Sequence, residues 1–311
     1  MDKKKIIKYA VITYTIAWAL QIAGSIYMLN NPDMTGQYVF KGSLAVCMFA
    51  PLLATLIVNK NLRGMGWKPQ IRKNFKWLIF AAYAIAPVTL IGGALFYIIF
   101  PSLFDANGSY MIAQNAESGV DLEKMIRESG LTMQSFMIIQ LVPSLIIAPF
   151  LNIITAIGEE IGWRGFLYPE LNKSLSRAKT WIIGGVFWAV FHFPAMLLGG
   201  YEYGFDYIGS PWFGLIVFTL FCITAGIIEE IVYDKTKSIW YAALLHGSIN
   251  AFLTIPPVFL NANEQAMIDK YAVFGPFGTG LITGLPMLIL AIIMGIAVLR
   301  KDTGRNKEVT V

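Results

Sequence analysis

The two histidines of this 311-residue chain, His192 and His246, both lie inside long apolar stretches. An ionisable side chain within an apolar helix is costly, so it usually serves a function. At about 1.5 Å per helical residue, we expect both imidazoles roughly 12–18 Å below the same membrane surface. This common depth predicts one shared site for acid–base chemistry or metal binding. The alternative is that each ring only bonds a neighbouring carbonyl.

A second group of ionisable residues ends another apolar stretch, in the segment Glu159-Glu160-Ile161-Gly162-Trp163-Arg164. Glu160 and Arg164 are four residues apart and share a helix face, so we expect an ion pair. Glu159 points about 100° away from Glu160 and is left without a local cation. It is therefore the better candidate for a general base, with the ion pair as its support. The alternative is a charged helix end at the membrane surface.

One polar and one aromatic residue lie a helical turn from the histidines. Asn250 follows His246 by four residues, so its amide and the imidazole project to one side and offer donors for a developing oxyanion. Trp188 precedes His192 by four residues, and we expect its indole over that histidine's helix face. Ordinary core packing is the alternative role for Trp188.

Glu229 and Glu230 resemble the first acidic pair, because they also end an apolar stretch that precedes a short basic loop and a histidine-bearing helix. No arginine follows them at four residues. We therefore expect both carboxylates at a solvated membrane interface. The likeness of the two acidic pairs is either a faint internal duplication or a coincidence.

Several familiar catalytic motifs are absent from the sequence. It contains no His-Glu-x-x-His zinc motif, no Gly-x-Ser-x-Gly elbow and no glycine-rich phosphate loop. Cys47 and Cys222 have no basic neighbour that would activate a thiol, so we expect both to be inert packing residues.

The elements that carry these residues are expected to be transmembrane helices. Apolar residues make up 56% of the chain and charged residues 14%, against about 25% charged residues in soluble domains. This balance excludes a soluble enzyme or binding module. Stretches of bilayer length predict an all-α membrane protein, a bundle of about eight transmembrane helices that forms one domain over residues 1–311. The motifs lie in a core at about 138–259. The predicted spans are Ile6–Leu29, Lys41–Val58, Trp77–Phe100, Ile138–Gly158, Thr180–Leu198, Pro211–Ile228, Ser238–Phe259 and Thr279–Leu299.

Basic residues predict how this bundle lies in the membrane. Most of the 24 Lys and Arg residues fall in the termini and in alternate loops; the exceptions are Lys41, Lys124, Arg127 and Lys270. The positive-inside rule therefore predicts both termini in the cytosol. The net charge of +5 then reflects orientation, and nucleic-acid binding is not expected. The longest loop, 101 to about 137, is expected outside, with a short helix near Leu122–Glu128.

Three motifs in this order resemble the type II CAAX prenyl endopeptidases, also called the CAAX protease and bacteriocin-processing (CPBP or Abi) family. That family carries Glu-Glu-x-x-x-Arg, Phe-x-x-x-His and His-x-x-x-Asn/Asp elements on successive intramembrane helices. Here they read Glu159-Glu160-Ile-Gly-Trp-Arg164, Trp188-Ala-Val-Phe-His192 and His246-Gly-Ser-Ile-Asn250. Trp188 replaces the family's Phe and keeps an aromatic ring. The resemblance covers about 151–250.

The resemblance implies an intramembrane endopeptidase, whose catalytic residues here would be Glu159, His192, His246 and Asn250. The first two would hold and deprotonate the attacking water, and the last two would stabilise the oxyanion. Glu160, Arg164 and Trp188 would support them. The family is commonly labelled metalloprotease, and Glu159 with the two histidines could make a three-ligand zinc site. Because Asn is a poor zinc ligand and a glutamate–histidine pair can activate water unaided, we favour a site without a cofactor, with Zn²⁺ as the alternative.

The resemblance also implies the partners and the location. They are a lipid bilayer and a prenylated or other membrane-bound protein, cut after the lipidated cysteine of a C-terminal Cys-a-a-X tail. Related members are assigned to bacteriocin processing or self-immunity. The expected location is the plasma membrane if the source is prokaryotic, with the site in a cavity open to the cytosol. Two other functions stay open: a non-catalytic immunity or scaffold membrane protein, and a proton-coupled transporter with Glu159, His192 and His246 as its relay.

Overall fold

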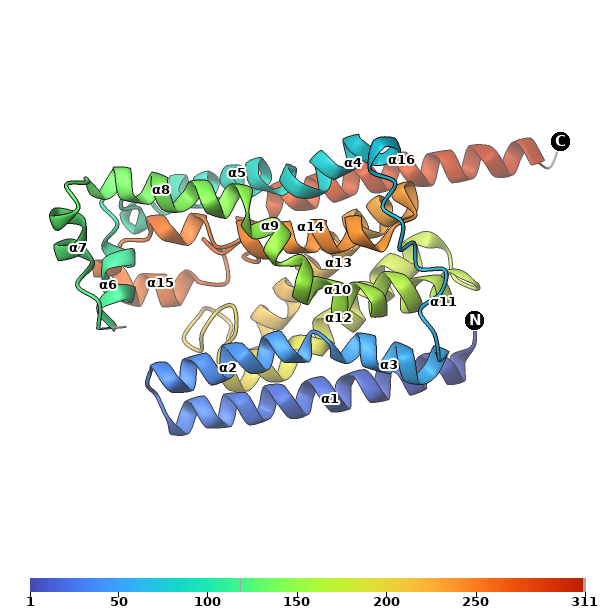
Figure 1. Cartoon of the computed structure of the whole chain (residues 1–311), viewed down its shortest axis with the longest axis horizontal. Coiled ribbons are helices and arrows are strands. Elements are labelled where there is room, and N and C mark those ends of the chain that lie inside the picture. The colour runs from blue at the N-terminus through green and yellow to red at the C-terminus, as the bar shows by residue number, and fades with distance from the viewer. Residues whose placement is uncertain (118, 310–311) are drawn as a thin grey trace.

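The computed structural model describes residues 1–117 and 119–309, which are mostly helical (Figure 1). The longer helices are α1 (Lys3–Asn30), α2 (Met34–Cys47), α3 (Ala50–Asn59), α4 (Ile71–Tyr83), α5 (Ile85–Ile99), α8 (Met133–Ile146), α10 (Ile153–Gly162), α12 (Arg177–Gly199), α13 (Trp212–Thr236), α14 (Ile239–Phe252) and α16 (Leu285–Val309). Shorter pieces are α6 (Ser109–Glu117), α7 (Leu122–Glu128), α9 (Ala148–Leu151), α11 (Tyr168–Asn172), α15 (Gln265–Tyr271), the π-helical turn η2 (Trp163–Leu167) and the 3-10 turns η1 (Pro101–Leu103), η3 (Pro256–Phe259) and η4 (Ala262–Glu264). The described residues form no strand, so the predicted all-α fold is confirmed.

Six segments within the described residues are long and apolar enough to cross a membrane. They are Lys3–Asn30, Met34–Asn59, Ile71–Ile99, Arg177–Gly199, Trp212–Thr236 and Ile239–Phe259. A seventh is counted if α7 and α8, which meet at 99°, form one bent span. The protein is therefore an integral, multi-pass membrane protein, as predicted. The short helix expected near Leu122–Glu128 is also confirmed, as α7.

The predicted span Ile138–Gly158 is broken rather than continuous. It is divided among α8, α9 and α10. Pro143 lies inside α8 and Pro149 lies in the first turn of α9. Because proline has no N–H to donate and its ring crowds the preceding turn, a continuous helix through this segment is disfavoured.

The predicted span Thr279–Leu299 becomes helical only at Leu285, where α16 begins. Residues 279–284 form turns instead. Their backbone packs directly on α5, where a Cβ atom added at Gly92 would lie 1.9 Å from the carbonyl oxygen of Thr283. This close backbone contact replaces the first turn of the expected helix.

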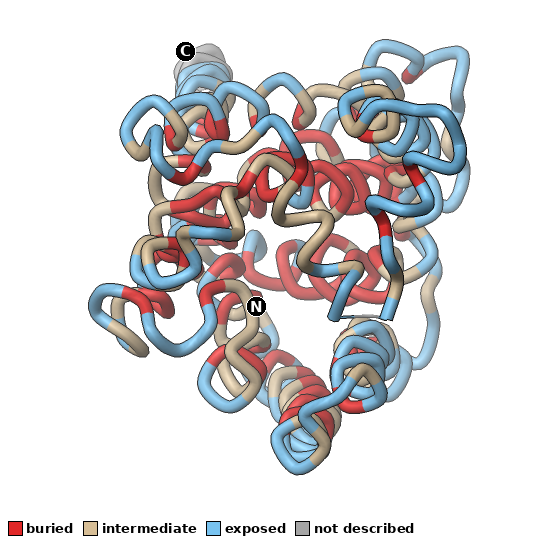
Figure 2. The backbone as a smooth tube through the Cα atoms, turned by 90° about the vertical axis from the view of Figure 1, so that its left-hand side faces the viewer, coloured by how far each residue is buried: buried red, intermediate tan, exposed pale blue. Residues whose placement is uncertain are grey.

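The long helices lie roughly along one axis, with α1 and α2 forming a hairpin on one side and α4, α5 and α16 on the other (Figure 1). The inner helices are α13 and α14: 72% of their apolar windows is buried, against 28% for α1. Figure 2 shows the buried backbone gathered in the middle of the bundle. The start of α1 and the end of α16 lie at the same end of the bundle (Figure 1).

Two glycines bring α10 close to the α2–α3 segment. A Cβ atom at Gly162 would lie 2.2 Å from the Cβ of Pro51, and one at Gly158 would lie 2.7 Å from the carbonyl oxygen of Met48. Small residues let membrane helices approach closely. Since Glu159 and Glu160 lie between these glycines, the contact sets where their carboxylates enter the bundle.

Candidate active site

The predicted site residues come from neighbouring helical segments at the centre of the bundle. Glu159 and Glu160 lie on α10, Arg164 on η2, Trp188 and His192 on α12, and His246 and Asn250 on α14. α10 packs against α14, and η2 packs against both α12 and α14. A π-helical turn such as η2 is rare and often marks a functional site.

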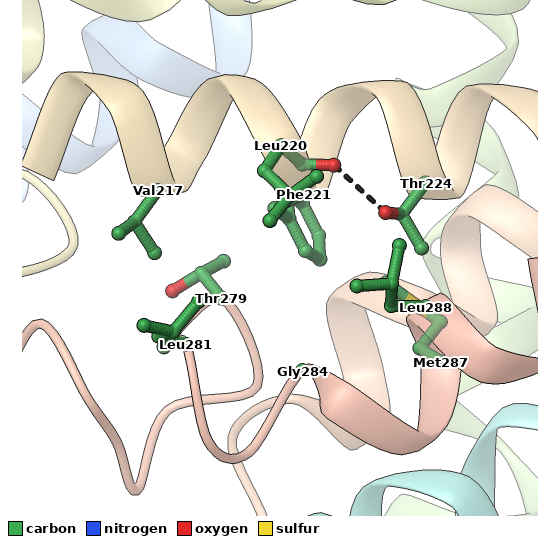
Figure 3. Close-up of a pocket in the computed structure, with 10 residues that line it drawn as sticks. Val217, Leu220, Phe221, Thr224, Thr279, Leu281, Gly284, Met287 and Leu288 are labelled. Atoms are coloured by element: carbon green, nitrogen blue, oxygen red, sulfur yellow. Dashed lines mark hydrogen bonds between the residues drawn. The ribbon is translucent and has the colours of Figure 1, made fainter.

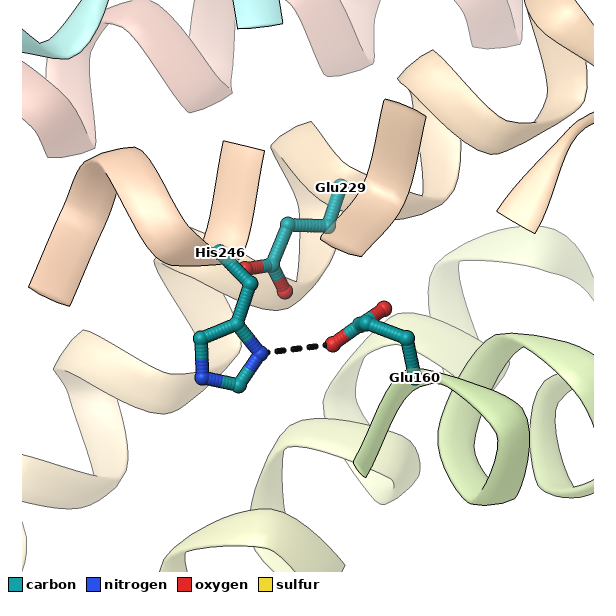
Figure 4. Close-up of side chains that lie close together, drawn as sticks. All are labelled: Glu160, Glu229 and His246. Carbon is teal, nitrogen blue, oxygen red and sulfur yellow. Dashed lines mark hydrogen bonds and ion pairs between the residues drawn. The ribbon is translucent and has the colours of Figure 1, made fainter. Parts of the chain in front are cut away.

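A buried charge network joins α10, η2, α13 and α14. Figure 4 shows three of its members, Glu160, Glu229 and His246. Glu160 Oε1 accepts hydrogen bonds from Arg164 Nη1 at 2.9 Å and from His246 Nδ1 at 2.8 Å. Arg164 Nη2 donates to Glu229 Oε2 and, at 3.4 Å, to the carbonyl oxygen of Gly226. The four ionisable side chains are between 0 and 2% exposed. The predicted Glu160–Arg164 ion pair is confirmed.

The predicted solvated position of Glu229 and Glu230 is wrong. Glu229 is fully buried and Glu230 is only 6% exposed. Arg164, 65 positions earlier in the chain, is the cation that pairs with Glu229, and Asn172 Nδ2 donates to Glu230 Oε1 at 3.4 Å. Buried carboxylates persist when they are paired, so these distant partners explain the burial.

Glu159 lies outside this charge network, as its place on the helix predicted. Its Oε2 accepts a hydrogen bond from Trp163 Nε1 at 3.0 Å, and both side chains are buried. Within the described part of the chain, no cation forms an ion pair with Glu159. The carboxylate is therefore held by a neutral donor, which leaves its charge available to accept a proton.

His192 is oriented by its own helix. Its Nδ1 lies 3.0 Å from the carbonyl oxygen of Trp188. Because a carbonyl oxygen only accepts, Nδ1 carries the proton and Nε2 of the neutral ring keeps its lone pair. The carbonyl contact considered from the sequence is therefore present. It leaves Nε2 able to accept a proton or to bind a metal.

The Trp188 ring lies against both histidines. Its centroid is 5.0 Å from that of His246 and 6.5 Å from that of His192. The same ring lies 5.4 Å from the Arg164 guanidinium carbon and is 4% exposed. The sequence placed Trp188 beside His192 alone. In the structure it links the two histidines that were predicted to share a site.

Three more aromatic rings surround His192. Phe191 and Phe218 meet the imidazole edge-on, with centroids 4.9 and 5.2 Å away. Tyr201, from the loop after α12, stacks on it at 6.0 Å. Sequence reasoning missed all three contacts. Phe191 is a chain neighbour, but no local spacing marks the other two.

A proline lies inside α12, two residues after His192. Pro194 has no N–H, and Trp18 of α1 donates instead to the carbonyl of Val190 at 3.2 Å. Gln21 of α1 donates to the Phe191 carbonyl at 2.9 Å and accepts from Ala195 N–H at 3.2 Å. These last two backbone groups are four residues apart, the spacing of the helical hydrogen bond. α1 thus completes the hydrogen bonds of α12 on both sides of His192.

α14 presents His246 and Asn250 from a helix that packs closely on α9. A Cβ atom at Gly247 would lie 2.5 Å from the carbonyl oxygen of Pro149. His246 is 2% exposed and Asn250, one turn later, is half-buried. No hydrogen bond to the Asn250 amide is formed by the described residues, so the amide is placed by its helix alone.

One trio of acidic and histidine side chains within the described residues is close enough to hold a metal ion. It comprises Glu160, Glu229 and His246, whose ligand atoms lie within 4.8 Å of one another. The zinc ligands considered as the alternative from the sequence, Glu159, His192 and His246, share only His246 with this trio. The Arg164 guanidinium already bonds both carboxylates, so a divalent cation there would meet like-charge repulsion. The trio therefore fits a guanidinium better than a metal.

A mostly apolar cavity lies between α13 and the segment 279–288 (Figure 3). Its lining includes Val217, Phe221, Leu281 and Met287, and none of the predicted site residues. Phe221 stacks on Phe218 at 5.8 Å, so aromatic rings separate this cavity from His192. The candidate site is the buried network, not this cavity.

Comparison with known proteins supports the motif assignment. Residues 141–252, which include every predicted site residue, match the model of the type II CAAX prenyl endopeptidase Rce1-like family. This chain carries an Rce1-like region. The chain is also 24% identical over 243 residues to the CAAX prenyl protease 2 of Methanococcus maripaludis, a match that covers 78% of this chain and 81% of the relative. The Rce1-like match and the relative's name indicate a peptidase.

Proposed function

We propose that this protein is an intramembrane endopeptidase that removes a short C-terminal peptide from a prenylated protein. The peptidase class follows from the Rce1-like region, and the name of the methanococcal relative supports the substrate class. A prenyl chain on a C-terminal Cys-a-a-X tail would hold the substrate in the bilayer. The peptide bond beside it would then reach a site buried among membrane helices.

Water activation is assigned to Glu159 and His192. Trp163 holds the carboxylate of Glu159, and the Trp188 carbonyl fixes the tautomer of His192 with Nε2 as the free acceptor. A proton passes from water to this pair while the water oxygen bonds to the carbonyl carbon of the substrate. This step needs no group beyond these two side chains.

Oxyanion stabilisation is assigned to His246 and Asn250. Since Nδ1 of His246 faces Glu160, its Nε2 is the nitrogen left for substrate (Figure 4). With both ring nitrogens protonated, Nε2 donates to the oxyanion, and the Asn250 amide is the second donor. Collapse of the intermediate breaks the C–N bond, and the proton taken from water passes to the leaving amine. One water is consumed, and one new carboxyl and one amine are formed.

The observation that carries this proposal is the meeting of His192 and His246 on the ring of Trp188, beside a buried acidic pair. The three motifs come from separate helices. The Trp188–His246 contact joins the second motif to the third, and the hydrogen bond between Glu160 and His246 joins the first motif to the third. Such an arrangement supports hydrolysis more directly than scaffolding, because ionisable groups are costly to bury without a function.

The orientation is part of the proposal. We assign both termini and the opening of the site to the cytosol, and the protein to the plasma membrane if its source is prokaryotic. The distribution of basic residues supports this orientation, and so does the place of the first and last helix ends at one end of the bundle (Figure 1).

The test uses the full-length protein, purified in detergent, with a farnesylated Cys-a-a-X peptide and its unlipidated form. We expect cleavage after the lipidated cysteine, a loss of about 10²- to 10⁴-fold in Glu159→Gln, and no loss in Glu123→Gln, an exposed residue of α7. Activity should survive a zinc chelator. Loss with the chelator and recovery with Zn²⁺ would overturn the cofactor-free assignment.

Two results would contradict the proposal itself. A folded protein that cleaves neither peptide would favour a non-catalytic scaffold. Proton-coupled uptake into liposomes that Glu159→Gln abolishes would favour the transporter.

A further inference from the structure

Glu229 is a buried carboxylate to which none of the three motifs assigns a role. It lies on α13, which carries no motif residue, and it is fully buried. Its partner is Arg164, whose other amino nitrogen bonds Glu160. Glu229 therefore stands at the far end of a chain of contacts that leads through Arg164 and Glu160 to His246.

The charges in this network require two carboxylates. Arg164 carries one positive charge and bonds both Glu160 and Glu229. With Glu229 as a full partner of the guanidinium, the charge of Glu160 remains available to a protonated His246. The formal charges of the four groups then sum to zero, because two carboxylates balance one guanidinium and one imidazolium. Buried charged groups are tolerated when oppositely charged groups balance them in this way.

Without Glu229, the guanidinium would pair with Glu160 alone. That pair is already neutral, so a protonated His246 would have no counter-charge in the network. The guanidinium would also lose its charged anchor on α13, where the carbonyl of Gly226 would remain. The ring of Tyr168, on α11, lies 4.9 Å from its central carbon.

We propose that Glu229 is a positioning residue of this site, which holds Arg164 so that Glu160 faces His246 and supports its protonated form. This inference rests on the proposed function, since its readout is cleavage of the prenylated peptide. Glu229 itself does not contact His246 through any hydrogen bond among the described residues, so it acts through its neighbours.

The test compares two adjacent carboxylates. Glu229→Gln removes the charge at constant size, Glu229→Asp keeps the charge on a shorter side chain, and Glu230→Gln is the matched control with Asn172 as its partner. We expect Glu229→Gln to lower kcat on the order of 10- to 100-fold with little change in KM. Glu229→Asp should recover part of that loss, and Glu230→Gln should stay close to wild type.

A double variant distinguishes a positioning role of Glu229 from a role in fold stability alone. If Glu229 acts through Glu160, then the Glu160→Gln and Glu229→Gln double variant should lose little more kcat than Glu160→Gln alone. Equal losses in Glu229→Gln and Glu230→Gln, or additive losses in the double variant, would overturn the inference. If Glu229→Gln does not yield folded protein, the kcat of Glu229→Asp is the deciding measurement. A Glu229→Asp kcat equal to the wild-type value would overturn the inference. An inactive wild type would instead contradict the proposed function.

Discussion

The indole ring of Trp188 lies with its centroid 5.0 Å from that of His246, on a different helix. This contact joins α12 to α14 at the point where the charge network ends. It also explains why this chain can have a tryptophan where the family that it resembles has a phenylalanine. Either residue places a flat aromatic ring between the two imidazoles. The ring thus spaces the two halves of the proposed site.

Replacement of Trp188 by alanine should lower kcat for the prenylated peptide on the order of 10- to 100-fold, because both histidines lose the ring that spaces them. Trp188→Phe should stay within a few-fold of wild type. Steady-state cleavage rates give kcat for both variants. Trp212→Ala, at a 70% exposed position on α13, is the control. A loss in Trp188→Phe as large as in Trp188→Ala would show that the indole N–H, not the ring, is required.

Gln21 offers a second test, far from the motifs in sequence. Gln21→Leu leaves the Phe191 carbonyl and the Ala195 N–H without their side-chain partner beside Pro194. An unpaired buried polar group costs about 1–3 kcal/mol, so we expect a lower Tm in detergent and a lower kcat through displacement of His192. Asn30→Leu is the control, because Asn30 bonds only an exposed carbonyl on α1. An unchanged Tm would mean that α12 closes its own hydrogen bond.

Local spacing predicted the contacts made within one helix. The Glu160–Arg164 pair followed from a separation of four residues, and Glu159–Trp163 has the same spacing, although that hydrogen bond was missed. The membrane fold followed from the length of apolar stretches, but Pro143 and Pro149 break one of them. Such breaks depend on whether neighbouring helices satisfy the freed backbone groups, which periodicity does not show.

Contacts between distant segments could not be predicted in this way. Arg164 reaches Glu229 across 65 positions, and Gln21 reaches Phe191 across 170. In the sequence, Arg164 and Glu229 resemble ordinary charged residues at helix ends, and Gln21 resembles an ordinary polar residue in the first helix. The prediction for Glu229 was wrong because it considered only a cation four residues further along the chain, where Tyr233 stands.

A glycine pair tests how closely α14 must pack. A methyl group at Gly247 would lie 2.5 Å from the backbone oxygen of Pro149, so Gly247→Ala must push α14 away from α9 and move His246 with it. We expect a stability loss of about 1–3 kcal/mol, seen as a lower Tm, together with lower activity. Gly42→Ala, within α2, meets no atom within 4 Å and should leave both unchanged or raise stability slightly. Equal behaviour of the two variants would contradict the close contact.

The loop after α12 covers His192 and contains a carboxyl group. Tyr201 stacks on the imidazole, and the next residue, Glu202, accepts a hydrogen bond from Thr279 Oγ1 at 2.6 Å. Tyr203 donates to the carbonyl oxygen of Thr279 at 2.8 Å. Burial raises the pKa of the Glu202 carboxyl above its ordinary value of 4.5, and the hydrogen bond from Thr279 opposes this shift only in part.

This raised pKa predicts that the loop docks more firmly in acid. A carboxyl whose pKa is higher in the docked loop stabilises docking fully below pH 4.5, and this stabilisation is lost as the pH rises through the raised value. Chymotrypsin cleavage at the exposed Phe205 reports loop opening. Glu202→Gln should be cut more slowly than wild type at pH 8 and at a similar rate at pH 5, whereas Asp206→Asn, an exposed neighbour, should match wild type at both. Equal wild-type and Glu202→Gln rates at pH 8 would contradict a docked, neutral Glu202.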